Sequence, residues 1–192
     1  PIPPSPLIRK KFDLRSRPVK AIAFVSALGV YEISFNKIKP DQRVLAPEWT
    51  DYNKRVQYQA YDVTEFLNAG TNVIAAQLAD GWYAGMLGPT RWSEYFPKRG
   101  AYGLNRMLFL QLEVKYSDGT KETIGSEGTW KIFSDGPIRT ADNFLGESYN
   151  ASKEVPDWQS VSFNDSAWNN VVADENTLNL VPQTNQPIKI IE

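Results

Sequence analysis

The segment 107–116 places aliphatic residues at every second position, and from residue 110 to residue 115 they alternate with polar side chains. Its even-numbered residues from 108 to 114 are aliphatic, and its odd-numbered residues from 111 to 115 are polar. Alternation of this kind predicts a strand with one buried face. The polar turn 117–120 follows, and residues 121–124 predict the returning strand of a hairpin. The chain is therefore expected to fold around antiparallel strands.

Short segments of similar character recur along the rest of the chain. Residues 129–133 follow the hairpin and predict that its strands continue as a meander. One short helix is expected at residues 65–69, with Thr64 as its N-cap and Gly70 as its stop. Short strands separated by turns predict an all-β fold, an antiparallel β-sandwich of jelly-roll type with one short helix. The other predicted strands are 19–25, 31–36, 57–63, 72–78 and 188–191.

The length of 192 residues predicts one main domain with its own core. Residues 1–18 begin with a Pro-rich run and are expected to form an extended leader. The β-sandwich is expected to span residues 19–180. Residues 181–192 are expected to be a linker or the start of a next domain.

Composition excludes several classes of function. The chain has 21 Lys and Arg against 22 Asp and Glu, and its longest basic cluster is 9–11, which argues against nucleic acid and against a membrane surface as partners. No run approaches the ~20 apolar residues of a membrane-spanning helix. Because the chain lacks Cys and His, thiol nucleophiles, disulfides, imidazole bases and Cys/His zinc sites are excluded. A bound metal would be a hard cation held by oxygens, such as calcium.

The segment 78–85 places a carboxylate, two glycines and two adjacent aromatic rings directly after the apolar run 73–76. A flat ring surface beside hydrogen-bonding groups suits a sugar, which offers a patch of C–H groups and a rim of hydroxyls. The alternative is structural. Aromatic residues at a strand end also close sandwich cores, and glycines there permit a turn.

The segment 86–103 is expected to be a long irregular loop rich in aromatic residues. Ordinary connections have roughly 4–6 residues, so a loop of this length predicts a functional surface or a lid. In the carbohydrate hypothesis, aromatic rings form a stacking platform while carboxylates and an arginine bind sugar hydroxyls. The predicted binding residues are Asp51, Arg55, Asp80, Trp82, Tyr83, Trp92 and Tyr95.

A series of segments in fixed order resembles the N-terminal domain of bacterial α-L-rhamnosidases. The resemblance runs from about residue 19 to the end of the chain. Two positions depart from the family pattern: Lys37 follows Asn36 where glycine is usual, and Asn150 stands where Asp is common. The segments that carry the resemblance are 28–32, 45–52, 56–64, 80–83, 146–151, 158–168 and 181–183.

The resemblance implies a galactose-binding-like jelly-roll domain that precedes further β domains and an (α/α) barrel. In this family the carboxylate pair that hydrolyses the rhamnoside with inversion lies in the barrel. The chain is therefore expected to be a non-catalytic accessory part of a bacterial, periplasmic or secreted glycoside hydrolase. Its expected partners are rhamnose-containing glycans and other domains of the same polypeptide.

The resemblance also implies a possible calcium site, because related modules use calcium to bridge protein and sugar hydroxyls. The metal candidates Asp142, Asn143 and Glu147 come first, with Asp51 and Asn53 as further oxygen donors. The alternative is that these residues are solvated turn residues or Asx caps.

Two other functions remain open at this point. In the first, the domain is a scaffold whose exposed aromatic residues pack against neighbouring domains. In the second, the chain is itself a hydrolase, which requires two carboxylates facing a cleft, and Glu94 with Glu147 is the pair to test.

Overall fold

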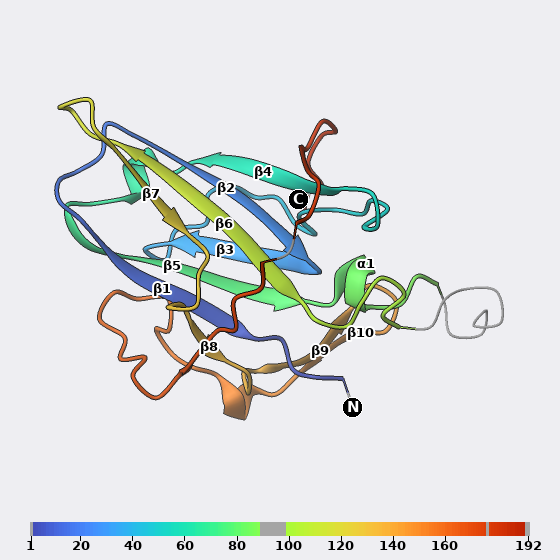
Figure 1. Ribbon diagram of the computed structural model, residues 1–192. Coiled ribbons are helices and arrows are strands. Elements are labelled where there is room, and N and C mark those ends of the chain that lie inside the picture. The colour runs from blue at the N-terminus through green and yellow to red at the C-terminus, as the bar shows by residue number, and fades with distance from the viewer. Residues whose placement is uncertain (1, 89–98, 176, 191–192) are drawn as a thin grey trace.

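Two five-stranded sheets face each other across an apolar core in the computed structural model of the chain, which describes residues 2–88, 99–175 and 177–190 (Figure 1). The strand order is β11-β8-β1-β5-β3 in the first sheet and β12-β4-β2-β6-β7 in the second. All pairs within the two sheets are antiparallel except β12 with β4. The predicted β-sandwich is confirmed.

The first sheet comprises β1 (Leu7–Leu14), β3 (Val30–Phe35), β5 (Gly70–Ala79), β8 (Lys131–Phe133) and β11 (Asn169–Asn170). The second comprises β2 (Lys20–Leu28), β4 (Val56–Asp62), β6 (Met107–Lys115), β7 (Lys121–Gly125) and β12 (Leu180–Pro182). A separate hairpin is formed by β9 (Ile138–Asp142) and β10 (Gly146–Tyr149). Within the described residues, the helical elements are the single turns α1 (Gly81–Ala84), η1 (Thr64–Phe66) and η3 (Ala151–Lys153).

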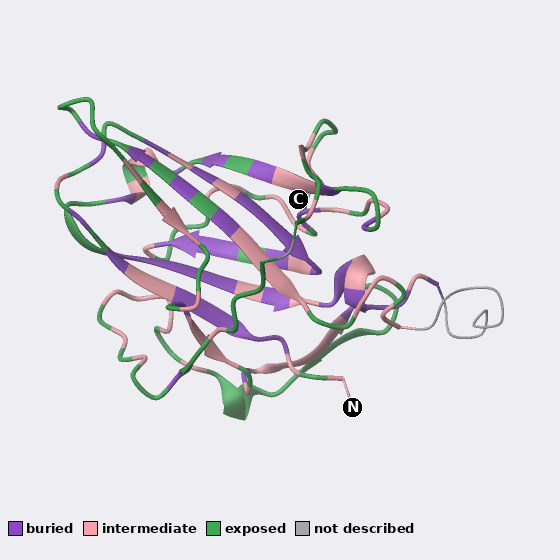
Figure 2. Cartoon of the chain, in the orientation of Figure 1, coloured by how far each residue is buried: buried purple, intermediate pink, exposed green. Residues whose placement is uncertain are grey.

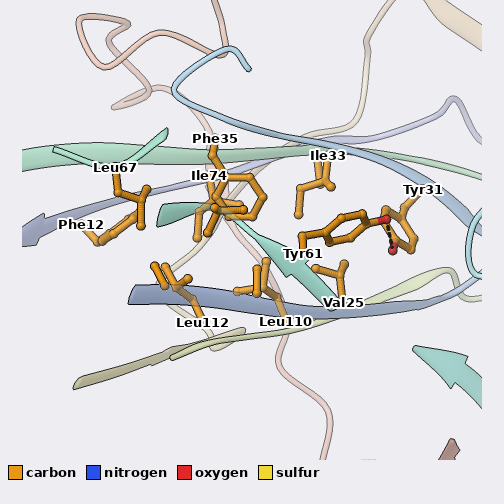
Figure 3. Packing of buried hydrophobic residues seen from close by; sticks show 14 of the residues in the cluster. Phe12, Val25, Tyr31, Ile33, Phe35, Tyr61, Leu67, Ile74, Leu110 and Leu112 are labelled. Atoms are coloured by element: carbon orange, nitrogen blue, oxygen red, sulfur yellow. Dashed lines mark hydrogen bonds between the residues drawn. The ribbon is translucent and has the colours of Figure 1, made fainter. Parts of the chain in front are cut away.

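The core lies where the inward faces of the two sheets meet, as Figure 3 shows. In β6, Leu110, Leu112 and Val114 are buried and the polar residues between them are exposed, which gives the striped pattern in Figure 2. The period of two in the sequence thus identified the buried face of this strand. Among the described residues, no helix combines the length and apolarity that crossing a membrane requires.

A buried tyrosine pair lies inside this core. The hydroxyls of Tyr31 and Tyr61 are 2.9 Å apart, and the Tyr31 hydroxyl also donates to Oε1 of Gln59 at 2.7 Å. Burial raises the pKa of Tyr61 to about 12 and raises the pKa of Tyr31 well above its ordinary value. Both tyrosines therefore stay neutral at physiological pH, and their hydrogen bonds satisfy polar groups that the core would otherwise penalise.

The predicted leader is wrong for residues 7–14, which form β1 between β5 and β8. The sequence of this segment does not predict a half-buried strand, because its outward face carries Arg9 and Lys11. A later part of the chain covers that face. Arg9 donates to the carbonyl of Ser160 at 2.7 Å, and Lys11 donates to the carbonyl of Phe163 at 2.7 Å. Backbone carbonyls from a segment distant in sequence thus replace water as hydrogen-bond acceptors for these two side chains.

Two further predictions about local structure are corrected. The third segment of the expected meander, β8, leaves the second sheet and pairs with β1 and β11, because the buried Trp130 just before it packs between the sheets. The expected helix at 65–69 is only the 3-10 turn η1, and Thr64 does not cap it. Its Oγ1 instead accepts from the backbone nitrogen of Ala21 at 2.9 Å.

The C-terminal segment packs onto the sandwich. β12 runs parallel to β4, and the backbone nitrogen of Val44 donates to the carbonyl of Ile188 at 3.0 Å. The strand predicted at 188–191 is represented by a single bridge between Arg43 and Lys189, and residues 191–192 lie outside the described part of the chain.

Candidate functional site

The turn at the end of β5 positions the aromatic residues of the segment 78–85. Gly81 begins α1 with φ +55°, and a Cβ atom there would lie 2.7 Å from Cγ1 of Val30. Glycine is required here, because other residues rarely adopt this positive φ and because any side chain would clash with Val30. The chain therefore turns sharply, and α1 lies at one end of the sandwich, beside the β9–β10 hairpin (Figure 1).

Trp82 stacks on Trp49 at this end of the molecule. The ring centroids are 6.4 Å apart and the ring planes differ by 5°. Trp49 is 52% exposed and Trp82 is half-buried, so the pair offers an apolar ring surface to solvent. We call this pair the tryptophan surface. Sequence reasoning did not single out Trp49 as a site residue. The sequence feature that could have identified it is a large aromatic residue within a polar, turn-rich segment, the same segment that holds Asp51 and Arg55.

Tyr83, like Trp82, packs against a small second core formed by Leu28, Tyr52 and Val56. Its ring meets Tyr52 edge-on at 5.4 Å, and Tyr52 meets Tyr102 at 5.0 Å. Tyr52 is buried, and burial raises its pKa above the ordinary value. A Cβ atom on Gly103 would lie 2.2 Å from the Tyr83 hydroxyl oxygen. Tyr83 therefore packs in a small second core, as the structural alternative for this motif predicts.

Asp80 lies inside the protein and is 1% exposed. Its Oδ2 accepts from Nη2 of Arg99 at 2.6 Å, and its Oδ1 lies 3.4 Å from Nη1 of Arg106. Burial lowers the pKa of the Arg106 guanidinium, and the nearby Asp80 carboxylate raises it. The structure thus places this predicted sugar ligand in a buried ion cluster, out of contact with solvent.

Asp51 and Arg55 bracket a tight turn that follows Trp49. The backbone nitrogens of Lys54 and Arg55 donate to the carbonyl of Asp51, at 2.8 and 3.0 Å. The Asp51 carboxylate accepts from the nitrogen of Asn53 at 3.2 Å and lies 3.2 Å from Nζ of Lys54. Arg55 is exposed. The turn keeps these two predicted site residues in the same loop as Trp49.

Three of the predicted residues cannot be placed. Trp92 and Tyr95 of the expected stacking platform lie within 89–98, outside the described residues, as does Glu94 of the hydrolase alternative. Its proposed partner, Glu147, is exposed in β10.

Asp142 is 7% exposed and its carboxylate is engaged by backbone groups. Oδ2 accepts from the nitrogen of Met86 at 2.7 Å, and Oδ1 accepts from those of Phe144 and Leu145 at 2.8 and 3.0 Å. Asn143 and Glu147, the other metal candidates, are exposed. Within the described ranges, no three acidic residues gather into a group that could hold a metal ion. Calcium binding therefore stays a prediction that these side chains do not support.

Comparison with known proteins identifies the family. The family model described as the α-L-rhamnosidase N-terminal domain matches residues 16–192. An α-L-rhamnosidase of Streptomyces avermitilis is 42% identical over 189 residues, which are 95% of this chain and 17% of that protein. One of Formosa agariphila is 34% identical over 186 residues, which are 95% of this chain and 19% of that protein. The chain spans 16% to 20% of the length of the curated relatives that it matches.

Solved structures agree with this comparison. The S. avermitilis α-L-rhamnosidase complexed with L-rhamnose matches with a TM-score of 0.91 at 40% identity, over 100% of this chain and 18% of that chain. The native enzyme of Aspergillus terreus matches with a TM-score of 0.86 at 32% identity, over 97% of this chain and 21% of that chain. A Pleurotus ostreatus lectin in complex with GalNAc, at a TM-score of 0.52 and 18% identity over 88% of this chain and 37% of that chain, shares the fold alone. The chain therefore belongs to the family of α-L-rhamnosidase N-terminal domains.

Proposed function

We propose that this domain is a non-catalytic carbohydrate-recognition module of an α-L-rhamnosidase, and that the tryptophan surface binds rhamnose-containing glycans. The observation that carries the proposal is the parallel Trp49–Trp82 pair, with Trp49 more than half exposed at 52%. A large aromatic ring left in water has a free-energy cost that a stacked sugar ring removes. Parallel rings fit this role because the C–H face of a pyranose is itself nearly flat.

Neighbouring polar side chains supply the second half of the chemistry. Asp51 and Arg55 follow Trp49 in one loop, and Arg55 is exposed. A carboxylate accepts hydrogen bonds from sugar hydroxyls, and a guanidinium donates hydrogen bonds to them. Asp80 and Tyr83 are left out of this proposal, because they are committed to the buried ion cluster and to the second core. The L-rhamnose complex of the S. avermitilis relative makes L-rhamnose the first sugar to test.

Removing the exposed ring is expected to weaken sugar binding at this surface. In a titration of the chain with L-rhamnose, tryptophan fluorescence should change saturably, and Trp49→Ala should weaken binding about tenfold or more, since one aromatic stacking contact contributes about 0.5–1.5 kcal/mol beyond the area it buries. The titration is run with calcium and with a chelator.

Trp158→Ala is the matched control, because Trp158 is a half-buried tryptophan that packs on Trp168, with 6.3 Å between the ring centroids, in another cluster. It should leave the affinity for L-rhamnose unchanged. No saturable change at millimolar L-rhamnose, in either condition, would contradict carbohydrate recognition by this chain.

A second candidate function is a scaffold, favoured by the tip of the β9–β10 hairpin. Phe144 and Leu145 are 47% and 49% exposed there, yet their backbone nitrogens are held by the buried Asp142. A rigid, exposed apolar tip suits a contact with another domain of the same polypeptide.

The scaffold candidate predicts a loss of stability only in the longer polypeptide. Replacing both Phe144 and Leu145 with serine should lower the melting temperature of the full-length enzyme by several degrees, because the apolar contact between domains is lost. The same variant of the isolated domain should melt as the unchanged domain does, and should bind L-rhamnose equally well. An equal fall in both proteins would place the effect within the domain and refute the contact.

A further inference from the structure

A cleft of about 510 Å³ lies at one edge of the sandwich, between the start of β6 in the second sheet and β8 and β11 in the first. Its volume lies within the usual range of small-molecule sites, about 300–1,000 Å³. The chain after β11 passes along it on the way to β12. None of its lining residues belongs to the tryptophan surface or to the Asp51–Arg55 turn.

The wall of the cleft is apolar and held in place. Leu108 comes from β6, and Ile132 comes from β8. Both are only partly buried, although they pack against the main core. Trp130 lies behind them, 2% exposed, with its indole Nε1 donating to the carbonyl of Gly125 at 2.9 Å. The cleft therefore offers fixed apolar surface that the fold itself does not cover.

Polar residues line the cleft on both sides of its apolar surface. Asn105 precedes β6 and Asn169 begins β11, so the two residues line the cleft from opposite sides. Asp174 follows on the chain that borders the cleft. Within the described part of the chain, the side chains of Asn105, Asn169 and Asp174 make no hydrogen bond or ion pair with protein groups, and all three are exposed. Their donors and acceptors are available to a ligand.

The charges around the cleft argue against an anionic ligand. Glu127 and Asp174 contribute two carboxylates to the lining, and Arg106 contributes one guanidinium. Arg106 is already engaged, because Nη2 donates to the carbonyl of Pro4 at 2.7 Å and Nη1 faces Asp80. A cation would have no convergent acidic group to bind, since no such group occurs among the described residues. A neutral ligand suits this balance of charges.

We propose that this cleft is a second saccharide site, separate from the tryptophan surface, which binds a neutral sugar ring between the Asn105 and Asn169 side chains. A sugar has an apolar C–H face for the wall formed by Leu108 and Ile132, and hydroxyls that both donate to and accept from side-chain amides and carboxylates. A purely hydrocarbon ligand would leave the amides unused and would desolvate them at a cost. The inference does not depend on sugar binding at the tryptophan surface.

The test is a titration followed by two-dimensional NMR of the isotope-labelled chain. L-rhamnose, D-galactose and D-glucose are added in turn, and the reporters are the Trp130 indole N–H and the side-chain amides of Asn105 and Asn169. At least one sugar should shift these signals saturably. The double variant Asn105→Ala/Asn169→Ala should raise the apparent Kd about tenfold, since it removes two hydrogen-bonding side chains.

Matched variants separate the two sites and control for folding. Gln186→Ala removes an exposed amide outside the cleft and should leave the titration unchanged. Trp49→Ala should weaken binding at the tryptophan surface and leave the Trp130 indole shift intact. Absence of any shift at the cleft reporters would overturn the proposal. So would shifts that persist in the double variant, or shifts produced by benzyl alcohol and by none of the sugars.

Discussion

Replacing Asp80 with alanine is expected to lower the free energy of unfolding by about 3–5 kcal/mol, because it leaves two arginines without their shared counter-charge. The Asp80 carboxylate is 1% exposed, and the side chains of Arg99 and Arg106 are 19% and 8% exposed. Water cannot replace the lost carboxylate around groups buried to this degree, and the two guanidinium groups would repel each other. Urea unfolding followed by tryptophan fluorescence measures the change.

The control for Asp80 is Glu32→Ala. Glu32 pairs with Lys39 at 2.6 Å, but both side chains are 59% exposed, so its loss should change the unfolding free energy by less than about 1 kcal/mol. If Asp80→Ala left stability unchanged and weakened the binding of sugar, the buried ion cluster would not be its role. The carboxylate would then have to reach a ligand, as the sequence alone suggested.

Replacing Asp165 with alanine, at the outer face of the first sheet, is expected to lower the free energy of unfolding by a similar amount, about 3–5 kcal/mol. Asp165 pairs with Arg9, whose side chain is 0% exposed although it projects from β1. Burial lowers the pKa of the Arg9 guanidinium, and Asp165 raises it. Without Asp165, this charge would keep, among the described residues, the Ser160 carbonyl and the ring of Phe163, whose centroid lies 5.3 Å away.

A second variant tests whether the buried charge causes this loss. Arg9→Met combined with Asp165→Ala should recover part of the stability, because methionine fills apolar space without a charge to desolvate. Glu65→Ala removes an ion pair with Arg17 in which the Glu65 side chain is 78% exposed and the Arg17 side chain is 60% exposed. It should lower the free energy of unfolding by less than about 1 kcal/mol. A double variant as unstable as the sum of its single variants would indicate that the two residues act independently.

The sites differ in how far local sequence could predict them. Trp82 was identified because it follows an apolar strand directly, within a motif of a few residues. Its stacking partner Trp49 lies on a distant loop, and ring stacking depends on where that loop returns to the sandwich. Asp80 shows the converse. A carboxylate at a strand end looks available to a ligand, but Arg99, from the end of the long loop, and Arg106, from just after it, pair with Asp80.

The sequence by itself determined the β-sandwich, because side chains alternate across a strand with a period of two and that signal is local. Resemblance of ordered segments, which the family model matches, also identified the family. Only the tertiary structure decided which polar residues are buried and which strands are neighbours. Arg9 and Lys11 make the sequence of β1 look like an exposed polar segment. The residues that cover its outer face, 160–165, are distant in sequence and are not visible in the local pattern. Burial of a charged side chain depends on such partners, and no local pattern contains them.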